Sequence, residues 1–217
     1  LLLENGIEPV MQISCRDRNK IALQSDILGA NALGIKNILC ITGDSVKAGD
    51  QQNTKAVHEF ESVKLLKQIQ SFNNGIDPTY ELLSDHRTEI FAGAAADPSH
   101  KNLKIVKMRT KQKKEAGARF IQTQMIMDKK YLIDFCDKIS KPLNLPVLAG
   151  VFLLKSYKNA LFINKFVPGA NIPDQILNRL KESNDPSEEG INIAAEQVRE
   201  FIDISQGVHI MAVKNEH

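Results

Sequence analysis

Two polar residues lie at or shortly after the ends of apolar runs, where a side chain can take part in chemistry. Asp44 follows the apolar run 37–41, and Gln124 closes the alternating run 120–124. A carboxylate at the end of a buried strand can stabilise a cationic intermediate, and an amide offers a donor and an acceptor together. The alternatives stay open, because Gly-Asp-Ser is also good turn chemistry and Gln124 could face solvent at a strand end.

A third candidate is the basic stretch 109–114, in which Arg109 precedes Lys113 by one helical turn. A run of this kind is by default a solvated helix face. Histidines at 58, 86, 100, 209 and 217 show no metal-ligand spacing, and no metal site is predicted. His209 alternates with apolar residues, which favours a hydrogen-bonded core or rim histidine over a ligand.

The elements that must position these residues follow from the hydrophobic pattern. Strand and helix alternate with no hairpin signal, which predicts right-handed βαβ units and a parallel sheet. Strands are expected at 9–14, 37–41, 89–94, 119–124, 146–151 and 208–211. Helices are expected at 19–33, 62–72, 103–115 and 130–139, followed by a longer final helical stretch. In the first helix the apolar residues recur near a period of 3.6, which is typical of a helix: Ile21, Leu23, Ile27, Leu28 and Leu33.

Two connections are long. The loop 44–60 follows a strand end, where loops of this length tend to bind ligands. The connection 73–87 follows a helix, and we interpret it as structural.

Composition limits the classes of protein to consider. A chain of 217 residues with a net charge of +2 gives no bulk electrostatic case for a nucleic acid or a membrane as partner. No apolar stretch reaches the length of a membrane span. The three cysteines, Cys15, Cys40 and Cys136, are odd in number and widely spaced, which fits reduced thiols and predicts a cytoplasmic protein.

Six segments, in order, resemble the flavin-dependent methylenetetrahydrofolate reductases. They are CRDRN, LQS, LGI and TGD within 15–44, FAGAAADP at 91–98, KKEAGARFIQTQ at 113–124, PVLAGV at 146–151, VPG with IP within 167–173, and GVHIMA at 207–212. The resemblance covers roughly residues 9 to 216. It implies a (β/α)8 TIM barrel of which this chain supplies about strands 3 to 8, as a single partial domain over residues 1–217. An open six-stranded sheet is the competing interpretation.

The resemblance also assigns the substrate-binding residues. The Asp that matches Asp44 lies beside the flavin and the pterin in the family, where it favours the iminium cation of the folate. The Gln that matches Gln124 contacts the folate. Ile163 falls where an aromatic residue covers the folate in some members. The family's general acid is a Glu on the first strand, and the chain, which opens at Leu1 within an element, is expected to be a fragment without it.

The flavin contacts implied by the resemblance lie earlier in the chain. The Lys that matches Lys113 contacts the phosphate-bearing arm of the flavin, and Arg109 could join it. Further cofactor contacts are expected at Gln12, Thr42, Gly43, Asp44, Ala95 and Ala96. Gln12 and Thr42 replace a His and an Arg of the best-known bacterial members, so the contacts there would differ in detail.

The activity implied is FAD-dependent reduction of methylenetetrahydrofolate to methyltetrahydrofolate, with NADH, NADPH or another electron donor. The ending 209–216 is similar to members from anaerobes, some of which work with a zinc-bearing partner subunit, and a homo-oligomer is also considered. Two alternatives remain: the reductase module of a homocysteine methyltransferase fusion, and a non-catalytic flavin- or folate-binding remnant.

Overall fold

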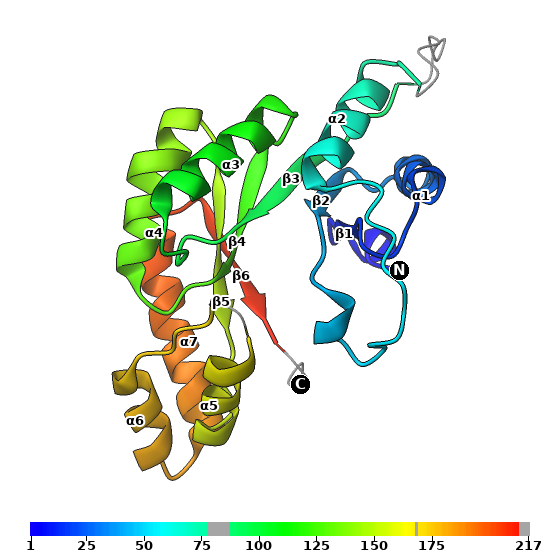
Figure 1. The fold of residues 1–217 in the computed structure, drawn as a ribbon. Coiled ribbons are helices and arrows are strands. Elements are labelled where there is room, and N and C mark those ends of the chain that lie inside the picture. Colours follow the sequence, from blue (N-terminus) through cyan, green and yellow to red (C-terminus); the bar gives the residue numbers. More distant parts are fainter. Residues whose placement is uncertain (78–86, 168, 213–217) are drawn as a thin grey trace. The chain divides into compact units, whose positions relative to one another are not determined.

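A computed structural model describes residues 1–77, 87–167 and 169–212 of the chain. Within these residues, strands and α-helices alternate from β1 to β5, and α5, α6 and α7 lie between β5 and β6 (Figure 1). The strands are β1 (Val10–Ser14), β2 (Asn37–Ile41), β3 (Phe91–Ala96), β4 (Phe120–Met125), β5 (Val147–Phe152) and β6 (Gly207–Met211). The α-helices are α1 (Lys20–Ala32), α2 (Ser62–Asn73), α3 (Leu103–Glu115), α4 (Lys129–Phe135), α5 (Tyr157–Phe166), α6 (Asp174–Glu182) and α7 (Pro186–Ile202).

The chain divides into two compact units, which we describe separately. The first unit comprises Leu1–Ala95 and Arg109–Phe120, and the second comprises Ala96–Met108 and Ile121–His217. In each unit hydrogen-bonded neighbours are parallel and follow chain order, β1-β2-β3 in the first and β4-β5-β6 in the second. Neither order contains the reversal that marks an open doubly wound sheet.

Parallel strands in chain order, joined by helices, are the repeat of a (β/α)8 barrel. The predicted fold class, α/β with this chain forming part of such a barrel, is therefore confirmed. That residues 1–217 form a single domain stays a prediction.

Most predicted elements agree with the structure to within two residues, and α3 agrees at both ends. The helix predicted at 19–33 is present as α1, but its apolar residues are only partly buried. Leu23 and Ile27 are fully buried, but Ile21, Leu28 and Leu33 are exposed. At 100° per residue Ile21 and Leu28 project to the side of α1 opposite Leu23, so only a narrow stripe of the helix packs.

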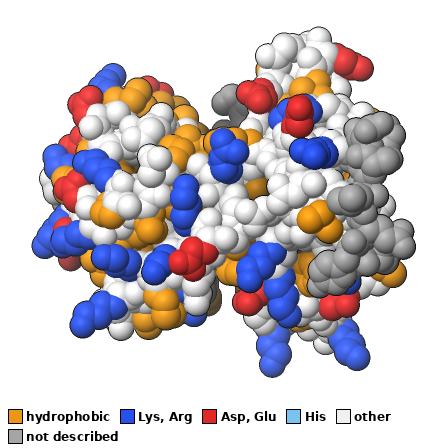
Figure 2. Space-filling model, turned by 90° about the horizontal axis from the view of Figure 1, so that it is seen from above, with side chains coloured by type: hydrophobic (Ala, Val, Ile, Leu, Met, Phe, Trp, Pro, Cys, Tyr) orange, Lys and Arg blue, Asp and Glu red, His pale blue; other side chains and the backbone are white. Residues whose placement is uncertain are grey.

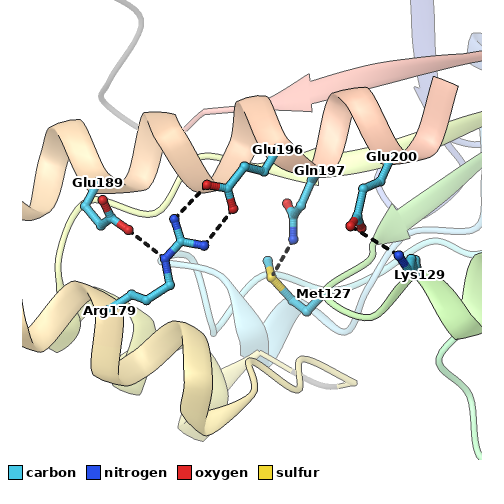
Figure 3. A network of polar contacts seen from close by, with 7 residues as sticks. All are labelled: Met127, Lys129, Arg179, Glu189, Glu196, Gln197 and Glu200. Carbon is cyan, nitrogen blue, oxygen red and sulfur yellow. Dashed lines mark hydrogen bonds and ion pairs between the residues drawn. The ribbon is translucent and has the colours of Figure 1, made fainter.

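The final helical stretch consists of three helices, held together by both apolar and charged contacts. Leu177 and Leu180 of α6 pack with Ile193 of α7 in one buried cluster. Arg179 of α6 reaches α7, donating from Nη1 and Nη2 to both carboxylate oxygens of Glu196 at 2.6 and 2.9 Å (Figure 3). The bidentate geometry makes this contact directional, and it fixes α6 against α7.

Three interpretations of the sequence include residues outside the described ranges. The connection 73–87 includes 78–86, the VPG segment includes Pro168, and the ending compared with proteins from anaerobes includes 213–216. For those residues the interpretations stay predictions.

The surface and the cysteines are consistent with the composition. On the face shown in Figure 2, basic and acidic side chains are interspersed. No helix in the described part of the chain has the length and apolar character needed to cross a membrane. Cys15, Cys40 and Cys136 are free and buried, and burial raises the pKa of the Cys15 and Cys136 thiols to about 11.

Candidate active site

The first group of candidate residues lies at the carboxyl end of β2. Asp44 is exposed, three residues beyond the last residue of the strand. Its charge acts on the guanidinium of Arg16, which follows β1. The pKa of Arg16 is raised first by its hydrogen bond to Asp17, at 2.7 Å from Nε to Oδ1, and also by the charges of Asp17 and Asp44. Asp44 therefore presents a carboxylate to solvent with a guanidinium nearby.

Gly43 holds this strand end against the end of β1. Its φ is +91°, a conformation that favours glycine, and a Cβ there would lie 2.7 Å from Cβ of Arg16 and closer still to Oγ of Ser14. The amide of Cys15 donates to the carbonyl of Ile41 at 3.1 Å, which extends the pairing one residue beyond the end of β1. Only a residue without a side chain can make the turn that leads to Asp44.

Thr42 connects β2 to the start of α2. Its Oγ1 accepts a hydrogen bond from the amide of Ser62 at 3.2 Å, one of the helix amides that lacks a partner within the helix. The loop between them is tied to β1, because the amide of Val57 donates to the carbonyl of Arg16 at 2.7 Å. A hollow of about 320 Å³ lies here, lined by Thr42, His58, Glu59, Phe60, Glu61 and Lys64.

Lys113 of α3 reaches the carboxyl end of β3. Its Nζ donates to the carbonyl of Ala95 at 2.7 Å, and the side chain is half-buried. Burial lowers the pKa of Lys113, the charge of Arg109 lowers it further, and the charge of Glu61 opposes both. The structure thus brings together three of the residues predicted to bind the cofactor, Lys113, Arg109 and Ala95, all within the first unit.

The other predicted cofactor residues are less closely associated. Gln12 is exposed in the middle of β1, where it pairs with Leu39 of β2. Ala96 is the last residue of β3, is 9% exposed and belongs to the second unit. Among the described residues, neither side chain makes a hydrogen bond or an ion pair.

In the second unit, Gln124 is exposed near the carboxyl end of β4. Beside it, His209 of β6 is half-buried, with Nε2 at 2.9 Å from the carbonyl oxygen of Thr123 and Nδ1 at 3.4 Å from Nε2 of Gln122. A carbonyl can only accept, so Nε2 carries the proton and Nδ1 accepts from the amide. Burial lowers the pKa of His209, against the effect of the hydrogen bond to Thr123, and favours this neutral form. The interpretation of His209 as a hydrogen-bonded histidine is confirmed.

Ile163, predicted to contact the folate, is buried in the structure. It is 4% exposed and lies in the core of the second unit with Ala160, Ile172 and Leu177. Its apolar surface packs α5 within this cluster, and the contact of Ile163 with the folate stays a prediction.

Three residues near the candidate site were not predicted to be part of it. The pKa of Arg16 is raised in part by the charge of Asp44, and the charge of Glu61 raises the pKa of Lys113. His209 donates a hydrogen bond to the carbonyl of Thr123, next to Gln124. Arg16 and Glu61 could have been found from the sequence, because each is a charged residue within two positions of the end of a predicted strand or helix. In the described ranges, no cluster of three or more His, Cys, Asp or Glu side chains could hold a metal ion.

Comparison with known proteins gives the class of this fold and site. Residues 1–217 match the family model described as methylenetetrahydrofolate reductase. The chain belongs to the methylenetetrahydrofolate reductase family, and the resemblance found in the sequence is confirmed.

Curated relatives agree with this assignment. Methylenetetrahydrofolate reductase 2 of Saccharomyces cerevisiae is 27% identical over 220 residues, covering 94% of this chain and 34% of the relative. Methylenetetrahydrofolate reductase 1 of Schizosaccharomyces pombe is 24% identical over 201 residues, covering 90% of this chain and 32% of the relative. The chain thus spans about a third of the length of these relatives.

A solved structure is similar at a lower level. It is an uncharacterized protein from Clostridium thermocellum that binds two copies of 5-methyl-5,6,7,8-tetrahydrofolic acid. It is 15% identical, with a TM-score of 0.48, and covers 99% of this chain and 92% of its own.

Proposed function

We propose that the full-length protein containing this chain reduces methylenetetrahydrofolate to methyltetrahydrofolate, with bound FAD and a reduced nicotinamide or another electron donor. The observation that carries the proposal is the family match over residues 1–217. A relative from Caenorhabditis elegans, 22% identical over 225 residues, is named a probable methylenetetrahydrofolate reductase (NADPH), which supports NADPH as one donor. The buried free thiols support a cytoplasmic location.

The residues of the first unit fit the anionic part of FAD. Lys113 and Arg109 place two cations near the carboxyl end of β3, and Lys113 is partly removed from water. A cation in that setting interacts with a diphosphate more strongly than a fully solvated one does. FAD, when bound, supplies the hydride that the substrate receives. The protein's part is to hold and orient the reactants.

We assign Asp44 and Gln124 roles in binding and activating the folate. The carboxylate of Asp44 stabilises positive charge on the folate as its methylene group becomes an iminium carbon. The side-chain amide of Gln124 hydrogen-bonds the edge of the pterin, which needs both a donor and an acceptor. Both side chains are exposed at or beyond the carboxyl end of a strand, and that end carries the active site in barrels of this kind.

Titration of the full-length apoprotein with FAD tests the cofactor assignment. We expect a yellow protein, and we expect Lys113→Met to weaken FAD binding about 10- to 100-fold, as loss of a charge-assisted hydrogen bond predicts. Methionine keeps the apolar stem of the lysine. The matched control is Lys111→Met, because Lys111 is exposed on the same helix and forms an exposed ion pair with Glu115 at 3.7 Å. Failure of the wild-type protein to take up FAD would contradict the proposal.

The variant Gln124→Leu tests the substrate assignment. We expect it to weaken folate binding by about 1–3 kcal/mol, because leucine keeps the approximate volume and removes both hydrogen-bonding groups. Reduction of the cofactor by the electron donor should change little. Gln112→Leu, at an exposed helix position, serves as the control. If Gln124→Leu melts much earlier yet handles folate normally, the residue is structural.

A further inference from the structure

The strand that carries Gln124 contains a β-bulge. Gln122 of β4 pairs with Leu148 of β5, but the next pair is Met125 with Gly150. β4 therefore advances three residues while β5 advances two. As a result, Thr123 and Gln124 of β4 together lie opposite the single residue Ala149 of β5. A bulge of this kind leaves backbone groups without ladder partners and changes the direction of the side chains next to it.

The hydroxyl of Thr123 supplies the hydrogen bonds missing at the bulge. Its Oγ1 donates to the carbonyl of Gln124 at 2.7 Å and accepts from the amide of Gly150 at 2.9 Å. The Thr123 side chain is 3% exposed, so water does not compete for these groups. One buried hydroxyl thus satisfies a carbonyl and an amide that the regular ladder would have paired.

Gly150 leaves the space that the bulge occupies. A Cβ at this position would lie 2.6 Å from the carbonyl oxygen of Gln124 and 2.9 Å from that of Thr123. Carbon and oxygen atoms that are not bonded do not approach so closely. The glycine is needed here for space and not for an unusual backbone angle.

His209 holds the bulge from the other side of β5. His209 is the register partner of Gly150, and its Nε2 donates to the carbonyl of Thr123 at 2.9 Å. The imidazole of β6 thus contacts β4 past the one residue of β5 that has no side chain. Its Nδ1, 3.4 Å from Nε2 of Gln122, extends the contact to the residue before the bulge.

We propose that Thr123, Gly150 and His209, which we call the bulge clamp, are positioning residues that fix the direction of the Gln124 side chain and thereby set the affinity for folate. The proposal rests on the proposed function, in which Gln124 contacts the folate. The bulge clamp itself has no contact with the substrate. It acts by holding the backbone of Gln124 in one arrangement.

The test uses the full-length FAD-loaded protein and titration with methyltetrahydrofolate. Thr123→Val keeps the shape of threonine and removes its hydroxyl, and we expect it to weaken folate binding about tenfold, as loss of a buried hydrogen-bonding group predicts. Thr123→Ser retains the hydroxyl and should bind folate within about twofold of wild type. FAD affinity and cofactor reduction by the electron donor should be unchanged in both.

A double variant separates positioning from a general loss of structure. If Thr123 acts through Gln124, Thr123→Val combined with Gln124→Leu should bind folate no more weakly than Gln124→Leu alone. Additive losses would overturn the inference. If Thr123→Val does not fold, two variants of His209 test the inference instead. His209→Gln keeps an amide donor and should retain folate affinity, whereas His209→Leu should lose it. Equal folate affinities of the two variants would overturn the inference.

The possible failures are distinguishable. Normal folate binding by Thr123→Val, with weakened binding by Gln124→Leu, overturns the bulge clamp and leaves the proposed function intact. Normal binding by Gln124→Leu overturns the substrate role of Gln124 and, with it, the positioning role of the bulge clamp.

Discussion

The variant Asp44→Asn is expected to bind FAD normally and to reduce methylenetetrahydrofolate about 10²- to 10³-fold more slowly, the range measured when one preorganised electrostatic group is removed from an active site. Asparagine keeps the size of the side chain and removes only its charge. Because Asp44 is exposed and three residues beyond β2, the substitution should not affect the core.

Measuring the two half-reactions separately shows which step the substitution slows. Reduction of the bound cofactor by the electron donor should slow much less than transfer to the folate, because the carboxylate is assigned to the cationic folate. Asp50→Asn, at an exposed position in the same loop, is the control and should leave both halves unchanged. Equal slowing of both halves in Asp44→Asn would instead indicate a general effect on the cofactor.

The variant Gly43→Ala is expected to destabilise the protein by about 2–5 kcal/mol. Part of this comes from a non-glycine residue in the left-handed region, at about 1–2 kcal/mol, and part from overpacking, at about 1–3 kcal/mol. Both causes apply at this position, because φ is +91° and the added Cβ would lie 2.7 Å from Cβ of Arg16.

Urea unfolding of the two glycine variants checks this prediction. Gly49→Ala is the matched control in the same loop, since its Cβ would meet nothing nearer than the carbonyl oxygen of Val46 at 3.6 Å and its φ is −99°. The midpoint for Gly43→Ala should fall while that for Gly49→Ala stays near wild type. Equal midpoints for Gly43→Ala and wild type would show that the ends of β1 and β2 are not packed as described.

Much of the fold could be predicted from the sequence because the apolar runs are short and separated by clear helical patterns. The run 37–41 is a strand whose three central residues are buried, as a continuous apolar run predicts for a parallel sheet. The association of Lys113 with Ala95 agrees with the cofactor assignment made from the motifs.

Other features depend on contacts between distant segments and could not be predicted locally. Ile163 looks like any apolar helix residue, and its burial depends on α6 and α7. The bulge in β4 is invisible in the regular alternation of residues 120–124, because it depends on Gly150 and His209 from two other strands. Exposure of Ile21 and Leu28 likewise follows from how little of α1 is covered.

The central claim is that the protein passes electrons through FAD to methylenetetrahydrofolate, and a single-turnover experiment tests it most directly. The full-length protein is loaded with FAD, reduced without oxygen and mixed with methylenetetrahydrofolate while the visible absorbance of the flavin is followed. The account predicts that oxidised flavin returns at a rate that depends on folate concentration, with one methyltetrahydrofolate formed for each flavin. A flavin that stays reduced, with no methyltetrahydrofolate formed, would contradict it.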